Sequence, residues 1–254
     1  MNFPSISLLV THYNRSRSLE LLLQSFRKLN CSFGEIVVSD DGSKPEHIAY
    51  LQQLQPLFGF KLITAEKNKG LGNNINKGQD AVTLPYTLYV QEDFEPQQQL
   101  PQKLAAALNF MEQNSRLDFV RFYAYIPYPY VKPFKDNFSE MHLPFWGWNT
   151  GKIYIYSDHP HLRRSSFLSK FGRYAEGLKG DRTEYRMCIS VLQKKAKGLF
   201  YNDYQALFVQ KNTETEPSTM KRESWRMSNN FFLRNLRNCY RQIKYNYDIL
   251  FMKP

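Results

Sequence analysis

Three short apolar stretches near the start of the chain, each followed by a helical pattern, restrict the fold more than any other feature. They cover residues 6–11, 35–39 and 60–64, and a fourth apolar stretch follows at 87–90. Runs of this length are typical of strands that are buried on both faces. Strands that alternate with helices at this spacing form a parallel sheet covered by helices on both sides. We therefore predict an α/β fold with a mostly parallel, doubly wound open sheet.

Carboxylates follow two of these strands directly. Asp40 and Asp41 end the second strand, and Gln91, Glu92 and Asp93 end the fourth. The carboxyl ends of parallel strands meet at one edge of the sheet, where ligands bind in open α/β folds. Oxygen ligands suit a divalent cation, and carboxylates also accept hydrogen bonds from a base or a ribose. We expect Asp93 to hold a metal ion and Asp41 to contact a nucleotide, with a turn-only role as the alternative for Asp41. Asp40 is either a second nucleotide contact or a turn cap.

The strand and helix pattern loosens after residue 100. It predicts helices over 104–111 and 181–192 and strands over 119–123, 152–156 and 199–209. Between them, residues 127–148 are rich in Pro and aromatic residues and are expected to form a long loop. Such a loop is either a lid or substrate wall, or a small aromatic core of its own. Its Trp146 and Trp148 suit the C–H faces of a sugar, so we assign them to acceptor binding.

The C-terminal stretch, 224–254, is predicted to be a basic amphipathic helix. Apolar residues recur at three- and four-residue spacing, and four basic residues lie between them: Arg234, Arg237, Arg241 and Lys244. Two alternatives follow: the helix docks on the domain with a solvated basic face, or it binds an anionic membrane surface.

Composition sets wider limits on the protein. With 254 residues and 42% hydrophobic content, the chain can bury a full core. The absence of a long apolar run and of a basic leader predicts a cytoplasmic protein, and three cysteines without metal-ligand spacing are expected to be reduced and structural. The net charge of +11 arises in residues 101–254, which carry 25 Lys and Arg against 13 Asp and Glu, whereas residues 1–100 carry 9 against 10. Such an excess attracts phosphates.

Several segments resemble the family 2 glycosyltransferases of GT-A fold, and they occur in that family's order. The opening strand and turn at 8–15 and the Asp-Asp-Gly-Ser segment at 35–43 come first. The remaining matches are paired Asn-Lys-Gly elements at 68–70 and 76–78, the metal motif at 91–93, a Gly-x-Phe-x-Glu-like segment at 171–176 and an acidic catalytic motif at 183–186.

The resemblance implies a site for each part of a sugar transfer. Asp93 corresponds to the ligand of Mn²⁺ or Mg²⁺, Glu184 to the catalytic base and Glu176 to an acceptor contact. The nucleotide-sugar contacts implied are Thr11, Tyr13, Asn14, Arg15, Asp41, Asn68, Lys69, Asn76 and Glu92.

Three departures from the family pattern change these assignments. Ile75 stands where the family often has an Arg before the second Asn, so Lys69 or Lys77 is expected to contact the diphosphate instead. Gln91 replaces the first carboxylate of the metal motif, which leaves Asp93 as the ligand. No His follows Glu184, although some members add one to the metal shell.

Glu184 and Glu176 are the two candidates for the general base. Glu184 is expected in the first turn of its helix, where the helix dipole keeps a carboxylate ionised and ready to accept a proton. Glu176 precedes Gly177 in a looser segment, which favours acceptor binding. The alternative for Glu184 is that it only stabilises its helix.

The implied function is transfer of a sugar, with inversion, from a nucleotide-sugar donor, with UDP as the expected nucleotide, to a saccharide or lipid-linked glycan in cell-surface polysaccharide or glycolipid synthesis. Residues 1–210 would form the glycosyltransferase domain, with 1–100 binding the donor and 101–210 the acceptor, and 211–254 a helical extension. A nucleotidyltransferase is the first rival, but it would need a Gly-rich loop after the first strand, where residues 12–15 contain no glycine. A non-catalytic membrane or nucleic-acid binder is the second. Carboxylates at successive strand ends would repel nucleic acid, so no nucleic-acid partner is expected.

Overall fold

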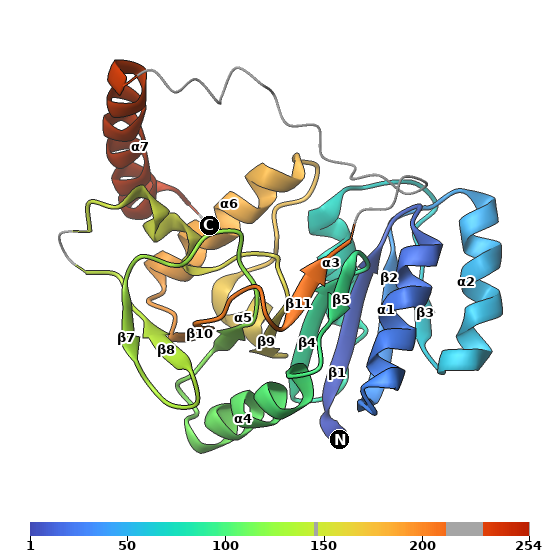
Figure 1. Cartoon of the computed structure of the whole chain (residues 1–254). Helices are drawn as coiled ribbons and strands as arrows, with labels where there is room; N and C mark the ends of the chain where they lie inside the picture. The colour runs from blue at the N-terminus through green and yellow to red at the C-terminus, as the bar shows by residue number, and fades with distance from the viewer. Residues whose placement is uncertain (145–146, 212–230, 254) are drawn as a thin grey trace.

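The computed structural model describes residues 1–144, 147–211 and 231–253, and Figure 1 shows how their helices and strands are arranged. The main sheet is built from β1 (Asn2–His12), β2 (Ser32–Asp40), β3 (Lys61–Ile63), β4 (Tyr86–Gln91), β6 (Phe119–Arg121), β7 (Val131–Pro133), β8 (Phe138–Met141), β9 (His161–Arg164) and β10 (Gly198–Tyr201). β5 (Phe94–Pro96) and β11 (Phe208–Gln210) form a separate antiparallel pair. The helices are α1 (Ser16–Lys28), α2 (Pro45–Phe58), α3 (Leu71–Asp80), α4 (Leu100–Gln113), α5 (Phe167–Phe171), α6 (Gly180–Gln193) and α7 (Phe231–Phe251), with the 3-10 helix η1 (Thr150–Ile155).

The strand order confirms the predicted α/β sheet. In the described part of the chain the main sheet has nine strands, in the order β3-β2-β1-β4-β9-β6-β10-β8-β7. The first four run parallel to one another, with β1 in contact with both β2 and β4. Beyond β4 the sheet is mixed, because β9 is antiparallel to both β4 and β6. The parallel half therefore brings the carboxyl ends of β1, β2 and β4 to one edge.

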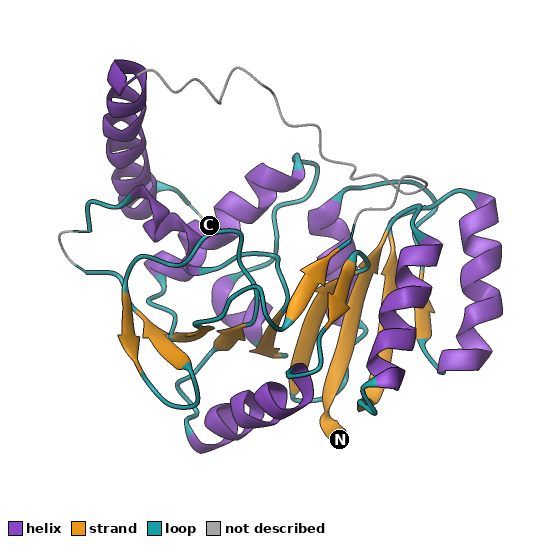
Figure 2. Cartoon of the chain, in the orientation of Figure 1, coloured by secondary structure: helices purple, strands orange, loops and turns teal. Residues whose placement is uncertain are grey.

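Two hydrophobic cores lie on opposite faces of the sheet, between the layers of helices that flank it (Figure 2). The side chains of β1 alternate between them: Leu8 and Val10 belong to one core, and Leu9 belongs to the other. All three side chains are fully buried. This double burial explains why the sequence of β1 is a continuous apolar run rather than an alternating one.

Local sequence signals set the ends of the helices. Pro45 occupies the first turn of α2, where backbone N–H groups have no partner within the helix, so the N–H that proline lacks is not needed. Gly59 ends that helix in the left-handed region with φ of 69°. Gly70, the residue before α3, also has a positive φ, of 88°, which favours glycine. The Gly- and Pro-containing turns of the sequence thus also position the neighbouring helices.

The predicted strand over 152–156 is wrong, because residues 152–155 belong to η1 and only Tyr156, which follows the helix, is extended. Asn149 starts this helix: its side chain accepts a hydrogen bond from the backbone N–H of Gly151 at 2.8 Å. The β-branched and aromatic composition of Ile153–Tyr156 resembled a strand, but both neighbours of β6 in the sheet are already supplied by β9 and β10. Burial of Ile153 and Ile155 against α6 stabilises the helical turn instead.

The long loop predicted over 127–148 contains a hairpin that the sequence reading missed. β7 and β8 pair in antiparallel fashion, and the turn between them uses Asp136 and Asn137, both with positive φ. Asp and Asn tolerate this conformation better than other residues with a side chain. The stretch 199–209 likewise divides into two strands, β10 and β11, which belong to different sheets.

Helix α7 docks on the domain. Tyr245, Ile249 and Met252 pack against the second core, and the side chain of Gln193 on α6 donates to the backbone carbonyl of Met252 at 2.7 Å. The docking alternative is therefore observed, while the part of the predicted helix at 224–230 lies outside the described residues. In the ranges that the structure describes, no helix is long and apolar enough to cross a membrane.

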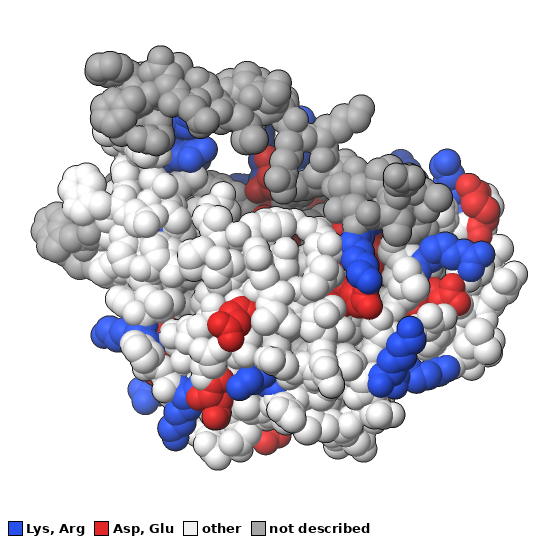
Figure 3. Space-filling view, viewed as in Figure 1, with Lys and Arg blue, Asp and Glu red and all other residues white. Residues whose placement is uncertain are grey.

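Charged side chains are unevenly distributed on the surface. On the face drawn in Figure 3, Lys, Arg, Asp and Glu lie mainly toward the lower and right-hand edges, and the middle is largely uncharged. The basic excess of the sequence therefore forms no continuous stripe over the described residues of this face.

Gly78 provides a test of the packing of α3 on the sheet. A Cβ atom at this position would lie 2.6 Å from Cδ1 of Leu9 and 2.9 Å from Cβ of Ser39, so Gly78→Ala should push the helix away from β1 and β2. We expect a loss of about 1–3 kcal/mol in the free energy of unfolding, measured by urea denaturation. Gly180→Ala is the control, because its Cβ would meet Leu71 at an ordinary 3.6 Å. Equal stability of the two variants would contradict this account of the packing.

Candidate functional site

Predicted site residues lie at the carboxyl edge of the parallel strands, in the turns after β1, β2 and β4. Arg15 follows β1, and Glu92 and Asp93 follow β4. The Arg15 guanidinium lies 3.0 Å from Oδ2 of Asp93 and 3.9 Å from Oε1 of Glu92, and both Arg15 and Asp93 are buried. The sequence placed these residues at one edge, and the structure brings them into contact.

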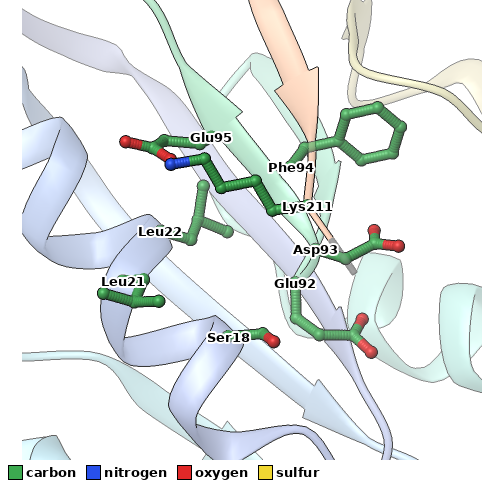
Figure 4. A pocket seen from close by; sticks show the side chains of 8 residues that line it. All are labelled: Ser18, Leu21, Leu22, Glu92, Asp93, Phe94, Glu95 and Lys211. Atoms are coloured by element: carbon green, nitrogen blue, oxygen red, sulfur yellow. The ribbon is translucent and has the colours of Figure 1, made fainter. Parts of the chain in front are cut away.

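Asp93 has one oxygen engaged and one free. Its Oδ2 accepts hydrogen bonds from Arg15 and from the side chain of Gln210 at 2.8 Å, whereas Oδ1 is buried without a hydrogen-bond partner. Figure 4 shows the Asp93 and Glu92 side chains pointing to the same side of β5, while Glu95 points the other way and meets Lys211. The cavity drawn there measures about 20 Å³, enough for one water molecule, so it is not a substrate pocket.

The free oxygen of Asp93 fits a cation that has few protein ligands. Among the described residues, no three His, Cys, Asp or Glu side chains are grouped so as to hold a metal ion. Mg²⁺ usually binds one or two carboxylates, several waters and substrate phosphates, so a closed protein cage is not required. The donor set present here, a single unpaired carboxylate oxygen, is compatible with that kind of site.

Asp41 holds the loop in front of α3. Its two oxygens accept hydrogen bonds from the backbone N–H groups of Lys69 and Gly70, each at 2.9 Å. Burial raises the pKa of Asp41 above its usual value, although these two bonds and the nearby Lys77 act in the opposite direction. The carboxylate thus fixes the first Asn-Lys-Gly element at the sheet edge, while the side chains of Asn68 and Lys69 remain exposed.

Both carboxylate oxygens of Asp40 are hydrogen-bonded to other groups of the protein. His12 Nδ1 lies 2.8 Å from Oδ1, and the backbone N–H groups of Gly42 and Ser43 donate to Oδ2 at 3.0 Å. Burial opposes ionisation, but the hydrogen bonds from His12 and Ser43 outweigh it and lower the pKa of Asp40. Of the two alternatives for Asp40, this geometry favours the turn cap.

The second Asn-Lys-Gly element joins α3 to the segment before α6. The Asn76 side chain accepts from the N–H of Tyr174 at 3.0 Å and donates to the carbonyl of Tyr174 at 2.9 Å and to Glu176 at 2.8 Å. Asn73 donates to the other oxygen of Glu176 at 2.8 Å. The hydrogen bonds from Asn76 and then Asn73 lower the pKa of Glu176. Both Asn76 and Glu176 therefore fasten two segments together.

The other predicted contacts are distributed around this edge. The Thr11 hydroxyl lies 3.0 Å from the hydroxyl of Tyr89, and Asn14 accepts from the N–H of Lys44 at 2.8 Å in a turn where its own φ is 53°. Tyr13 is half-buried. Trp148 is 77% exposed and lines a groove beside α7, and Trp146 lies outside the described residues.

Glu184 lies beside a buried acid that the sequence reading missed. The backbone N–H of Asp158 donates to Oε1 of Glu184 at 3.1 Å, and both carboxylate oxygens of Asp158 are buried without a hydrogen-bond partner. Burial raises the pKa of Glu184, and burial with the charge of Glu184 raises that of Asp158 well above its usual value. In the sequence, Asp158 lies two residues before Pro160, a pattern typical of an ordinary turn. Nothing in that pattern indicates a functional residue.

The expected state of Glu184 needs correction. Its helix begins at Gly180, so Glu184 lies beyond the first turn, and the helix dipole does not keep it ionised as predicted. Burial outweighs the hydrogen bond from Asp158 and the attraction of Arg121, so the proton is held more tightly than in an exposed Glu.

A comparison with protein families decides the classification. The family described as Glycosyl transferase family 2 matches residues 7–172, which is most of the chain. The chain belongs to this family. The resemblance of the sequence motifs is thereby confirmed. An uncharacterized glycosyltransferase of Haemophilus influenzae is 28% identical over 117 residues, covering 45% of this chain and 37% of that protein. The chain thus spans well under two thirds of this relative.

Solved structures share the fold. The crystal structure of S. aureus TarS 1-349 in complex with UDP-GlcNAc has a TM-score of 0.63 at 18% identity, with 86% of this chain and 62% of that chain covered. The mannosyltransferase PcManGT from Pyrobaculum calidifontis, in complex with GDP-Man and Mn²⁺, has a TM-score of 0.60 at 13% identity, covering 99% and 67%. This family 2 chain therefore has a GT-A-like fold.

The buried Asp158 predicts an unusual pH dependence of stability. Because its pKa is raised on folding, the native state holds a proton that the unfolded state releases, and the free energy of unfolding should fall as pH rises above the usual Asp range. Asp158→Asn should remove part of this fall, and its stability relative to wild type should increase between about pH 4 and pH 8.

Urea denaturation across that range measures the difference. Asp136→Asn, at an exposed turn, is the matched control. Parallel pH profiles for wild type and Asp158→Asn would show that Asp158 ionises as freely in the folded as in the unfolded chain.

Proposed function

We propose that this family 2 glycosyltransferase moves a sugar from a nucleotide-sugar donor to a hydroxyl group of a saccharide or lipid-linked acceptor, with inversion at the anomeric carbon. The observation that carries the proposal is the carboxyl edge itself, which carries the pair of Arg15 and Asp93 with its free oxygen, and the loop that Asp41 holds. A nucleotide diphosphate bound there would lie near the guanidinium group of Arg15 and a cation held by Asp93.

The donor is proposed to bind over β1, β2 and β4. Two neighbours of the same fold were solved with UDP-GlcNAc and with GDP-Man. These complexes support a nucleotide-sugar donor, and they are compatible with either uracil or guanine as its base. UDP remains our choice for the nucleotide. Within the first 100 residues, Thr11, Tyr13 and Asn14 would contact the nucleotide. The exposed Asn68 and Lys69 are positioned to contact the diphosphate.

The proposed cation is Mn²⁺ or Mg²⁺, held by Oδ1 of Asp93 together with donor oxygens. A divalent cation there would neutralise charge on the leaving diphosphate. Arg15 contributes in the same way, because it lies at the same carboxylate and its guanidinium can hydrogen-bond to phosphate oxygens.

Glu184 is the proposed general base. It lies on α6 next to Asp158, and the raised pKa of its carboxylate suits proton transfer, which is most effective when the pKa approaches the working pH. Glu184 would take the proton of the attacking acceptor hydroxyl as the bond from that oxygen to the anomeric carbon forms. The bond from the anomeric carbon to the diphosphate oxygen breaks on the opposite side.

Residues 101–210 are proposed to meet the acceptor. Trp146 and Trp148 remain candidates for stacking on a sugar, and Glu176 remains a candidate contact, although its oxygens are already bonded to Asn73 and Asn76. A role in cell-surface polysaccharide or glycolipid synthesis follows from an acceptor of this class.

The extension at 211–254 is proposed to hold the enzyme at the inner face of the cytoplasmic membrane. Helix α7 docks by one side, and its other side exposes Tyr240, Ile243 and Tyr247 at 61–73% of their surface. Arg241 is exposed beside them. An exposed apolar stripe flanked by basic residues is the surface expected of a helix that lies on an anionic membrane.

The metal assignment predicts the effect of Asp93→Asn. Transfer or hydrolysis of a nucleotide sugar should require Mn²⁺ or Mg²⁺. The variant should lose about 10²-fold or more of the rate, because the substitution weakens both the proposed metal ligand and the ion pair with Arg15. The measurement is nucleotide release over a panel of nucleotide sugars, with and without chelator. Near-wild-type turnover in excess chelator would eliminate the metal.

The base assignment predicts different effects for two glutamates. Glu184→Gln should lower kcat by about 10²–10⁴-fold while the donor KM changes little, because the amide cannot accept the proton. Glu176→Gln is the matched control, and it should act mainly through KM because Glu176 fastens the donor-side helix. If Glu176→Gln were inactive and Glu184→Gln turned over normally, the two roles would have to be exchanged.

A further inference from the structure

A large groove lies between α7, the C-terminal half of α6 and strands β8 and β10. Its volume is about 1300 Å³, beyond the roughly 300–1,000 Å³ of a pocket for a drug-sized ligand. Most of its wall is apolar, and the main contributors are Phe110, Leu117, Met141, Leu192, Leu199 and Ile249. The space and the chemistry suit a hydrocarbon chain better than a sugar.

A buried ammonium group opens into this groove. Lys152 on η1 is only 3% exposed, and its Nζ donates to the carbonyl of Gly147 at 2.9 Å and to Oδ1 of Asn246 at 2.7 Å. Both acceptors are neutral, and no carboxylate pairs with Lys152 within the described ranges. Burial lowers the pKa of Lys152, because no counter-ion in the described part of the chain compensates its charge. An anion from outside the chain would stabilise the charged form of this amine.

Other polar groups of the groove also lack partners. Gln242 is 8% exposed, and neither its amide nitrogen nor its amide oxygen makes a hydrogen bond to the described protein. It lies one turn from Asn246 on α7, the residue that Lys152 contacts, so these groups share one side of the helix. Nδ1 of His142 on the opposite wall is likewise buried without a partner. Buried polar groups are nearly always bonded, so such a set indicates a missing ligand.

The rim of the groove, like its buried Lys152, favours an anionic ligand. Lys195 and Lys197 line it and are exposed, and Glu140 is the acidic residue of the described lining. Three lysines against one glutamate give the groove a net positive charge. The complement of this surface is a molecule with an anionic group at one end and an apolar body.

We infer that the groove binds an anionic single-chain lipid, with its phosphate at Lys152 and Gln242 and its hydrocarbon chain along the apolar wall. Trp148, a candidate acceptor contact, lies at the border of the groove. The lipid site is centred away from the proposed base, because Leu192 lies about 12 Å along α6 from Glu184 at the rise of an α-helix. The inference therefore goes beyond sugar transfer and does not depend on it. A lipid held here would lie directly beside the exposed apolar side of α7.

Three related probes separate the chemistry of the head group from that of the chain. Palmitoyl lysophosphatidic acid carries both, monopalmitin carries only the chain, and glycerol phosphate carries only the head group. Titration of the full-length protein below the critical micelle concentration, without vesicles or donor, should give saturable binding of the lysophosphatidic acid. Monopalmitin should bind about tenfold or more weakly, the usual effect of a charged hydrogen bond, and glycerol phosphate should not bind measurably.

Two variants and a control locate the binding. Lys152→Met should abolish the preference for the lysophosphatidic acid over monopalmitin, and Ala196→Phe should fill the groove and weaken both. Lys135→Met, at an exposed lysine outside the groove, is the matched control and should bind like wild type. Circular dichroism and urea midpoints verify that each variant is folded. If Ala196→Phe does not fold, Gln242→Leu takes its place and should weaken binding of the lysophosphatidic acid.

Several results would overturn the inference. Equal affinity of wild type for the lysophosphatidic acid and monopalmitin would remove the anion site, and so would an unchanged preference in folded Lys152→Met. Absence of saturable binding to wild type would overturn the assignment of the groove to a lipid. Binding only to phosphatidylglycerol vesicles would assign the effect to the surface of α7 and not to the groove. None of these outcomes bears on donor turnover, so the proposed sugar transfer would stand.

Discussion

The pairing of β1 with two parallel neighbours is the constraint on which the rest of this molecule depends. Because β2 and β4 run in the same direction as β1, three strand ends open at one edge. Parallel pairing also requires each connection to cross a face of the sheet, which places α1, α2 and α3 where they protect both sides of β1. The functional groups are thereby carried on turns whose positions are fixed by buried backbone, not by the turns themselves.

The acids gathered at this edge differ in how the protein bonds them. Asp40 and Asp41 are stabilised locally by hydrogen bonds from backbone N–H groups, and Asp40 also by His12. Asp93 and Asp158 each keep at least one buried oxygen without a partner. Buried acceptors without a hydrogen-bond partner carry a free-energy cost. A ligand that supplies a cation or hydroxyl donors to these oxygens removes that cost. This gain favours binding of such a ligand, whatever its other contacts.

The sequence predicted the first half of the molecule well because its signals are local. Each strand from β1 to β4 is an apolar run followed by turn residues, and the acidic pairs mark the sheet edge directly. The second half depends on contacts between distant residues. Ile153 and Tyr156 have strand-like composition, yet Asn149 and packing on α6 make a 3-10 turn there. Asp158 belongs to no motif, and its importance arises only from its proximity to Glu184.

The bonds of Glu176 have a mechanical consequence. With both oxygens tied to Asn73 and Asn76, the end of the preceding segment moves with α3 as one body. Gly177 follows immediately, with φ of 72° and open space around its α-carbon, and α6 begins three residues later. The backbone of Gly177 is thus a joint between a fixed point and the helix that carries Glu184. Because α6 is itself packed into the second core, the bonds of Glu176 and the packing of α6 together fix the distance between the proposed base Glu184 and the strand edge.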